Sequence, residues 1–387
     1  MIKSNIFRQP KDILLFSLFA LLLFMGHRTG FITMLTLFCM LVTFVIPLNR
    51  YIDFQGILLI VFTICFTVIG ILNGCVDSLS TAIAYFIPSV FFYCLGKYLV
   101  DKIDYKPQLL LVMIVIITIY LLEIYFSIFQ KILSTGSIVN TSRLFYFGGN
   151  EGRQLTATLV GLGASLGFIG LPMFLLYKDK IEIRCLFLLL FFSSLITTIH
   201  LVNRTGLVIC VCSLIITLIY FYRFDLSKIL SGIIICSIIF LILVKLDIIS
   251  VDVFNAYALR NEVDFATGGN RTVRWLEALH QLFISPFGWA ENNGTTDYFV
   301  HNMWLDIAKV VGIIPFVTLL ICTISSFRVL FKLIKLKKDV VVAMLLSLNI
   351  CFFLSCFVEP VYGGLHFFLY VMLWGIQKQY LLTFCRK

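Results

Sequence analysis

One long polar segment, residues 247–301, interrupts a chain that is otherwise almost continuously apolar. It carries Arg260, Arg271, Arg274 and His301. The planar guanidinium of arginine binds phosphate and carboxylate groups through paired hydrogen bonds, and the imidazole of histidine exchanges a proton near neutral pH. These residue types predict that the segment binds an anionic substrate carried by the membrane and supplies a proton acceptor to it.

The residues from Arg271 to Phe283 have the pattern of an amphipathic helix. At about 100° per residue the apolar side chains share one arc and the polar ones lie opposite. The apolar members are Trp275, Leu276, Ala278, Leu279, Leu282 and Phe283. The flexible residues Gly268, Gly269 and Asn270 precede this helix, so its N-terminus would lie beside two arginines and could bind phosphate. An ordinary interfacial helix, with cations that reach toward water, is the alternative.

Three positions outside this helix can take part in the same chemistry. His301 stands directly before an apolar run that begins near Asn302, where a general base would face a substrate at the membrane surface. Arg204 belongs to the polar tip Asn203-Arg204-Thr205-Gly206 between two apolar runs, and Glu359 lies in another short turn. An arginine at such a tip faces the bundle or a wet cavity, unless it only anchors the interface. A purely structural role for His301 also stays open.

The composition of the chain indicates which class of protein carries these residues. The chain is 60% hydrophobic and 13% charged, with a mean hydropathy of +1.03. One membrane span takes roughly 20 apolar residues. We predict an all-α, polytopic membrane protein whose residues 1–387 form one integral-membrane domain with no cleavable signal peptide. About twelve spans are expected, at 12–26, 31–47, 54–72, 81–99, 108–130, 155–177, 185–201, 205–222, 229–246, 302–326, 340–358 and 365–383.

The basic residues predict the orientation of these spans. Of 30 lysines and arginines, 20 fall on one side if the N-terminus is cytoplasmic, which predicts that both termini lie on the cytoplasmic side of the membrane. Two loops on the other side are substantial, residues 130–154 and 247–301. Seven of the ten basic residues on that outer side are arginines, including Arg143 and Arg153 in the first loop. We expect these two to bind substrate, with random arginine usage on solvated loops as the alternative.

Several kinds of chemistry have no motif in this sequence. It lacks a paired-carboxylate Asp-x-Asp motif, a glycine-rich phosphate loop, a histidine or cysteine metal cluster and a dinucleotide fingerprint. The expectation is therefore chemistry without a cofactor, a metal or a nucleotide.

Three motifs, in order along residues 200–320, resemble those of the O-antigen polymerase and O-antigen ligase superfamily. The tip Asn203-Arg204-Thr205-Gly206 is similar to the family's Ser-Arg-Gly hairpin tip. Arg271 with Trp275, followed by Pro286 and Gly288, resembles its Arg-x3-Trp and Pro-Leu-x-Gly segment, and His301-Asn302 followed by Gly312 resembles its His-Asn and Gly entry into a span. The chain departs from the pattern at Asn203, where the family has serine, and at Pro315, near a second family glycine.

The resemblance implies transfer of a glycan from undecaprenyl diphosphate to an acceptor hydroxyl at the periplasmic face. In this scheme Arg204 and Arg271 are catalytic cations at the leaving diphosphate, and His301 accepts the proton of the attacking hydroxyl. Arg274, Arg143, Arg153, Asn302 and Glu359 are the expected substrate-binding residues.

Two acceptors remain possible under that resemblance. A polymerase elongates another lipid-linked repeat unit, whereas a ligase transfers the glycan to lipid A-core; a second diphosphate site on the arginine-bearing first loop favours the polymerase. A flippase or transporter is the alternative from a different class, and missing internal symmetry disfavours it. The expected partners are the lipid-linked oligosaccharides and membrane lipids, with a chain-length regulator protein as an open alternative and no nucleic acid.

Overall fold

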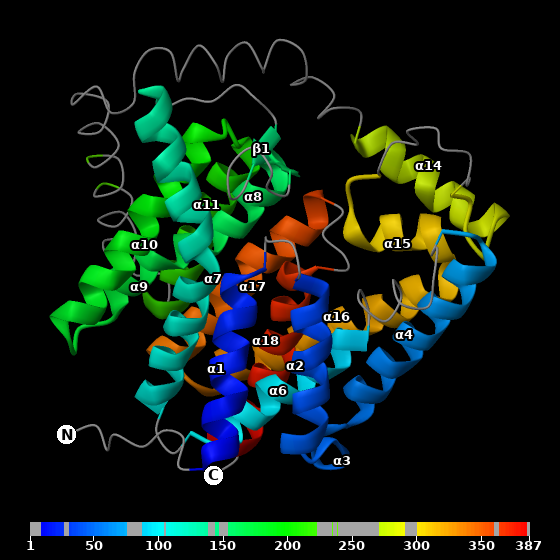
Figure 1. The fold of residues 1–387 in the computed structure, drawn as a ribbon, viewed down its shortest axis with the longest axis horizontal. Coiled ribbons are helices and arrows are strands. Elements are labelled where there is room, and N and C mark those ends of the chain that lie inside the picture. Colours follow the sequence, from blue (N-terminus) through cyan, green and yellow to red (C-terminus); the bar gives the residue numbers. More distant parts are fainter. Residues whose placement is uncertain are drawn as a thin grey trace.

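A computed structural model of the chain describes residues 9–26, 31–75, 87–103, 106–137, 144–146, 154–222, 234, 238, 271–290, 300–359 and 364–384. These residues are almost entirely helical, apart from one short two-stranded sheet (Figure 1). Apolar side chains dominate the helices, and a helix bonds all its backbone polar groups internally, as a lipid environment demands.

Within the described residues, six helices are long and apolar enough to cross a membrane: α4 (Phe54–Leu72), α7 (Lys106–Thr135), α10 (Ile181–His200), α11 (Arg204–Tyr222), α16 (Ile313–Leu336) and α17 (Val340–Val358). The protein is therefore a helical membrane protein. The remaining helices are α1 (Pro10–Phe24), α2 (Phe31–Val45), α3 (Leu48–Tyr51), α6 (Ile87–Asp101), α14 (Arg271–Ile284), α15 (Met303–Val311) and α18 (Leu365–Phe384).

Several predicted spans differ from the observed helices. The span expected at 155–177 consists of three consecutive pieces, α8 (Ala157–Ser165), the 3-10 turn η1 (Leu166–Ile169) and α9 (Gly170–Leu176). The expected span at 229–246 lies outside the described residues except for positions 234 and 238. The total of twelve spans therefore stays a prediction.

The span predicted at 302–326 was wrong in its boundaries. The helix stops at Gly312, which has a φ of 79°, so that a short α15 is followed by a separate α16. A Cβ on residue 312 would stand 2.0 Å from the carbonyl oxygen of Pro286, so only glycine fits at this break. Asp306 and Lys309 consequently belong to a short helix at one end of the bundle and not to a membrane span.

The first predicted loop, 130–154, also begins later than expected, because α7 continues to Thr135. Beyond it, β1 (Leu144–Tyr146) pairs antiparallel with β2 (Gln154–Thr156). The strand β1 thus lies within the predicted loop, and β2 begins at the last residue of that loop and leads directly into α8.

The centre of the bundle is the contact between α6 and α18. A Cβ on Gly96 would lie 2.2 Å from the carbonyl oxygen of Met372, and one on Gly375 would lie 2.1 Å from that of Tyr93. Each glycine therefore admits the backbone of the other helix. Around Phe92 of α6, the rings of Phe19, Phe38 and Phe368 lie 5.4–5.9 Å away, centroid to centroid, and join α1 and α2 to this centre.

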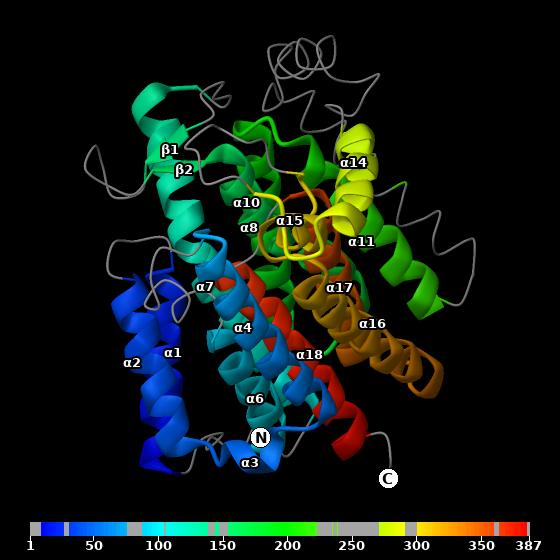
Figure 2. The ribbon, with the colours of Figure 1, turned by 90° about the vertical axis from the view of Figure 1, so that its right-hand side faces the viewer.

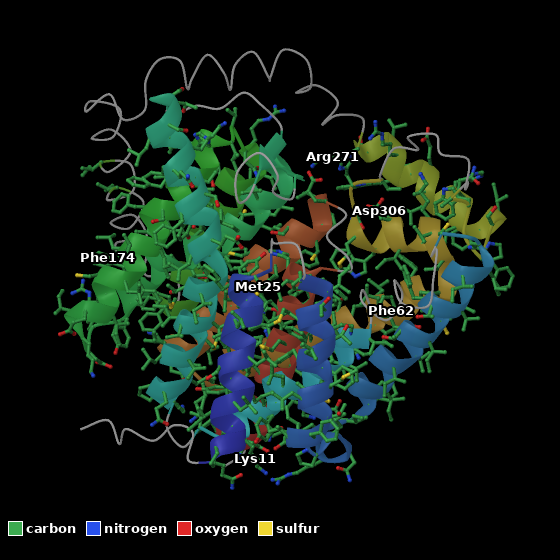
Figure 3. All side chains as sticks on the ribbon, in the orientation of Figure 1. Lys11, Met25, Phe62, Phe174, Arg271 and Asp306 are labelled. Atoms are coloured by element: carbon green, nitrogen blue, oxygen red, sulfur yellow. The ribbon has the colours of Figure 1, made fainter. Side chains whose placement is uncertain are left out.

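One end of the bundle is held by three similar clusters, each made of an aspartate, a lysine and a tyrosine. Asp12 contacts Lys102 and Tyr98; Asp53 contacts Lys97 and Tyr93; Asp339 contacts Lys106 and Tyr380. We call this the lysine end. Figure 3 shows Lys11 at this end and Arg271 at the opposite end, which we call the arginine end. Two perpendicular views place α3 at the lysine end and α14 and α15 at the arginine end (Figures 1 and 2).

Candidate functional site

Three of the predicted site residues meet at the arginine end. The Nη2 of Arg271 lies 2.8 Å from Oε1 of Glu359, and the Nδ1 of His301 lies 3.0 Å from Oε2 of the same carboxylate. The sequence separates Glu359 from these partners by 88 and 58 residues. The side chain of Glu359 is 9% exposed, whereas those of Arg271 and His301 are each 30% exposed. A nearly buried carboxylate thus connects two groups that solvent or a ligand can reach. We call these three residues the Arg–Glu–His cluster.

Each member of the cluster occupies the end of a helix. Arg271 is the first residue of α14, and Glu359 caps the C-terminus of α17. His301 lies in the turn before α15 with a φ of 59°, a left-handed conformation that is uncommon for residues other than glycine. Helix ends project side chains beyond the packed bundle, which explains how three separate segments converge.

Trp275 fixes α14 over this site. Its indole N–H donates to the carbonyl oxygen of Val300 at 3.0 Å, and its ring packs edge-on against Phe357 with centroids 5.0 Å apart. Both contacts reach residues within two positions of His301 or Glu359, so a single side chain aligns Arg271 with the other two.

The buried face of α14 differs from the predicted arc. Ala278 and Leu282 are buried, and Trp275 is half-buried against Val300 and Leu305. Leu276, Leu279 and Phe283 are exposed, although periodicity groups them with the buried residues. The helix rests on α15 along a narrow stripe, and half of its apolar arc faces outward.

The segment after α14 ties its C-terminal end to the bundle. The side-chain amide of Asn73, at the end of α4, donates to the carbonyl oxygens of Phe287 at 2.6 Å and Val310 at 3.0 Å. The amide of Trp289 donates to the carbonyl oxygen of Lys309 at 2.8 Å. These bonds fix the C-terminal end of α14 against α15 and against the end of α4 at Asn73.

Asn302 has a structural task. Its side-chain oxygen accepts from the amide of Leu305 at 3.2 Å and so caps α15, while its Nδ2 donates to the carbonyl oxygen of Phe357 at 3.2 Å. Asn302 was predicted to bind substrate, but both of its side-chain polar atoms bind the protein itself and only 6% of the residue is exposed.

Asp306 is a residue that the sequence did not single out. Its Oδ1 accepts from the amide of Val300 at 2.8 Å and its Oδ2 from the amide of Asn302 at 2.9 Å. Burial raises its pKa to about 6, although both backbone hydrogen bonds favour the charged form. One sequence feature could have indicated Asp306: it is an acidic residue in the first turn of the helix that follows the His-Asn pair.

Arg204 lies at the same end of the molecule as the Arg–Glu–His cluster. Helices α11 and α17 run antiparallel, because Ser213 bonds Ser347 at 2.5 Å and the hydroxyl of Tyr220 donates to the carbonyl oxygen of Lys337. Extending this register by nine residues places Arg204 level with Cys356, within one helical turn of Glu359.

Asn203 explains why α11 begins at Arg204. Its side-chain oxygen accepts from the amide of Gly206 at 3.1 Å and caps the helix. Its Nδ2 lies 2.0 Å from the position of a Cβ at Gly161, so the tip of the hairpin packs directly on α8. The conformation of this polar tip is therefore set by packing as well as by capping.

Of the other predicted cations, the structure describes Arg274. Arg274 is half-buried on α14, one turn after Arg271. Arg143 and Arg153 lie outside the described residues, and so does Arg260.

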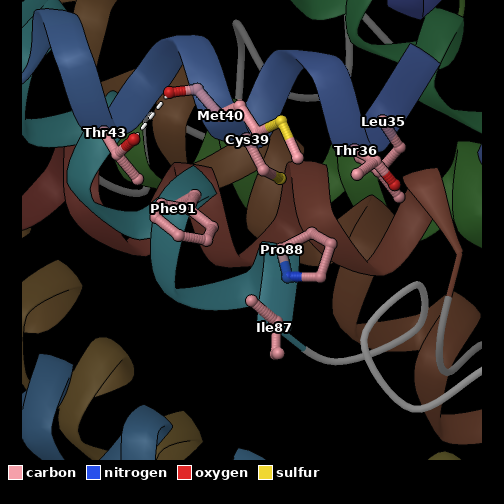
Figure 4. A pocket seen from close by; sticks show the side chains of 8 residues that line it. All are labelled: Leu35, Thr36, Cys39, Met40, Thr43, Ile87, Pro88 and Phe91. Atoms are coloured by element: carbon pink, nitrogen blue, oxygen red, sulfur yellow. Dashed lines mark hydrogen bonds between the residues drawn. The ribbon is translucent and has the colours of Figure 1, made fainter. Parts of the chain in front are cut away.

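An apolar groove elsewhere in the molecule does not belong to this site. A cavity of about 210 Å³ lies between α2 and α6 and is lined by Leu35, Thr36, Cys39, Met40, Thr43, Ile87, Pro88 and Phe91 (Figure 4). None of these described lining residues is charged, and the hydroxyl of Thr43 donates to the carbonyl oxygen of Met40 at 2.6 Å within its own helix. Such a mainly apolar surface suits hydrocarbon chains better than an anion.

The arrangement at the arginine end is suited to acid–base chemistry beside an anion. A carboxylate at Nδ1 orients the imidazole of His301, whose second nitrogen, Nε2, can exchange a proton, and the guanidinium of Arg271 has further N–H groups beyond the one directed at Glu359. A comparison with protein-family models and one with curated proteins each found no match to this sequence.

Proposed function

We propose that this protein is a membrane glycosyltransferase that transfers a glycan from undecaprenyl diphosphate to the hydroxyl of another lipid-linked repeat unit. The observation that supports the proposal most strongly is the Arg–Glu–His cluster at the end of the bundle opposite the lysines. It combines a proton acceptor and a cation on groups that are accessible from that end. The resemblance of the three motifs to the O-antigen polymerase and ligase superfamily supplies the identity of the substrate.

The proposal includes a topology. We place the protein in a bacterial inner membrane with about twelve spans, both termini in the cytoplasm and segment 247–301 in the periplasm. The concentration of lysines at the lysine end supports this orientation, because positively charged segments are retained on the cytoplasmic side. The Arg–Glu–His cluster would then face the periplasm.

In the proposed reaction, His301 is the general base. Its Nδ1–H donates to Glu359, and its Nε2 takes the proton of the acceptor hydroxyl. The hydroxyl oxygen forms a bond to the anomeric carbon while the bond from that carbon to the diphosphate oxygen breaks. A single displacement of this kind inverts the configuration at the anomeric carbon. Glu359 orients the imidazole and stabilises the imidazolium that forms, as a carboxylate does for other histidine bases.

The leaving diphosphate gains negative charge as the bond breaks, and arginines are the groups that would stabilise it. Arg271 extends from the start of α14, Arg274 follows one turn later, and Arg204 lies level with the end of α17. Cations held in place before the reaction stabilise the transition state without a reorganisation cost. We assign Arg143 and Arg153 to the glycan or to the diphosphate of the second lipid.

The first test replaces the members of the cluster and follows the surface polysaccharide. His301→Ala, Arg271→Ala and Glu359→Gln are each expected to lower transfer by about 100-fold or more, the scale expected for an essential base or a charge-stabilising group. His280→Ala is a matched control, because His280 is an exposed residue of α14 outside the cluster. Lipopolysaccharide is separated on gels from cells that carry only the variant gene.

The pattern on the gel distinguishes the candidate functions. Core bearing a single repeat unit indicates a lost polymerase, as we expect. Bare core with accumulated lipid-linked polymer indicates a ligase, whereas bare core with accumulated single lipid-linked repeat units indicates a flippase. A normal ladder in both the His301 and Arg271 variants would show that these residues do not form the active site.

A further inference from the structure

The turn that carries His301 is held on both sides by one carboxylate. The amide before the histidine, from Val300, and the amide after it, from Asn302, donate to the two oxygens of Asp306 at 2.8 and 2.9 Å. His301 itself has a φ of 59°. A left-handed conformation is unfavourable for a residue with a Cβ and persists only when its surroundings impose it.

The burial and the contacts of Asp306 are those of a residue that stabilises the backbone around it. It is 2% exposed, and both oxygens are occupied by backbone amides. Among the described residues, no lysine or arginine nitrogen forms a salt bridge with it. Burial of a carboxylate costs free energy, which its two amide hydrogen bonds and the nearby positive charge of Lys309 partly offset, so Asp306 stabilises this turn at the expense of its own hydration.

We propose that Asp306 is a positioning residue that holds the His301 turn and thereby directs the imidazole at Glu359. Its two hydrogen bonds hold the amides of Val300 and Asn302, the residues on either side of the histidine, and so restrict the backbone torsions of the turn. Asparagine cannot replace it, since one acceptor oxygen would become an NH₂ group that faces an amide N–H. The effect of Asp306 on glycan transfer rests on the proposed function, whereas its effect on the geometry of His301 does not.

A control substitution affects the packing of the same helix, α15. The indole N–H of Trp304, in α15, donates to the hydroxyl of Thr323 at 3.1 Å inside the bundle. Thr323→Val removes this buried acceptor and loosens the packing of α15, but it leaves the contacts of Val300 and Asn302 with Asp306 intact. Asp306→Asn and Thr323→Val therefore separate loss of the turn from general destabilisation of α15.

The first readout is the state of the His301 ring in the full-length protein in lipid bilayers. The chain has five histidines, so selective ¹⁵N-histidine labelling gives few signals, and His301→Gln identifies the signal of interest. In the wild type we expect Nδ1 to be protonated and shifted by its bond to Glu359. In Asp306→Asn, this signal alone should move toward that of an exposed imidazole such as His280, while Thr323→Val should leave it in place.

The second readout is transfer of a radiolabelled lipid-linked repeat unit in proteoliposomes. Asp306→Asn should reduce the turnover rate by about 10- to 100-fold, as expected for a misplaced base, while KM for the donor changes by less than about threefold. If Asp306→Asn does not accumulate, Asp306→Glu and Asp306→Gln form a pair of equal length that differs in acceptor oxygens, and Glu should retain more of the wild-type His301 signal.

The outcomes separate this inference from the proposed function. An unchanged His301 signal in Asp306→Asn, or an equal shift in Thr323→Val, would overturn the positioning role. If variants of Arg271 and His301 keep full transfer activity, the proposed function fails, but a selective shift of the His301 signal would still support the positioning role.

Discussion

At the scale of single residues, the site depends on how one carboxylate is shared. Glu359 contacts both Arg271 and His301, and its side chain is nearly buried while theirs are partly exposed. Hydrogen bonds between a carboxylate and a charged donor are stronger than those between neutral groups. Glu359 thus connects the guanidinium of Arg271 with the imidazole of His301, and both contacts depend on the position of the end of α17.

Asp306 makes the stability of the protein depend on pH. Burial raises its pKa from 3.8 to about 6, so between these values the native state holds a proton that the unfolded chain has lost. The free energy of unfolding should therefore fall by about 2–3 kcal/mol as the pH rises from about 4 to about 6, and it should remain level above that.

Thermal unfolding of the wild type and of Asp306→Asn across this pH range checks the prediction, because the other carboxyl groups titrate alike in both proteins. The difference in Tm between them should change through the window and become constant above it. Parallel profiles at every pH would show that the carboxyl of Asp306 titrates normally.

At the scale of elements, α14 links the site to the membrane-spanning helices. Its buried residues are Ala278 and Leu282, of which Ala278 packs with Val300 and Leu305, and its first residue is Arg271. Because one face is buried and the rest is open, the position of Arg271 depends on a small apolar contact area. Weak docking of α14 should therefore affect the site before it affects the rest of the fold.

Two leucines on α14 provide a matched comparison. Leu282 is 3% exposed and Leu276 is 68% exposed. Leu282→Ala should cost about 2–4 kcal/mol of α14 docking and raise the protease sensitivity of the helix, whereas Leu276→Ala should have a much smaller effect. Limited proteolysis in detergent micelles, together with the transfer assay, measures both. Equal effects of the two substitutions would mean that α14 does not dock through the Leu282 face.

At the scale of the whole molecule, the two ends have different tasks. The lysine end joins distant helices through the aspartate, lysine and tyrosine clusters, and the arginine end gathers exposed functional groups (Figure 3). The glycine contact of α6 and α18 adjoins the lysine end, because Gly375 lies against the backbone of Tyr93 and Lys97. Changes at the lysine end should therefore alter stability and leave the chemistry of the folded protein intact.

Asp53→Asn tests this separation. The side chain of Lys97 is only 5% exposed and lies 2.9 Å from Asp53, so removing the carboxylate leaves a buried, uncompensated charge at a cost of about 3–5 kcal/mol. The Tm should drop by several degrees with the turnover rate of the remaining folded protein unchanged. Arg50→Ala is the control, since that arginine is 71% exposed and 3.8 Å from Asp101, and a surface pair contributes about 0–1 kcal/mol. A loss of turnover in Asp53→Asn would show that the two ends are coupled.

Local patterns in the sequence predicted the helices well where hydropathy changes sharply. The predicted span at 340–358 coincides with α17, and the one at 205–222 begins one residue after α11. The same patterns failed at Gly312, because the apolar run continues through the break and only a φ of 79° beside Pro286 ends the helix. They also failed for the buried face of α14, because periodicity defines an apolar arc but not which part of it meets a neighbour.

The sequence alone determined that the chain is a helical membrane protein and that its cations and histidine stand in polar segments between apolar runs, because hydropathy and residue type are local properties. Only the tertiary structure decided that His301 and Arg271 share Glu359, that Asn302 caps a helix, and that Asp306 holds the turn between them. These contacts join helix ends far apart in the sequence, and their geometry follows from how the helices pack.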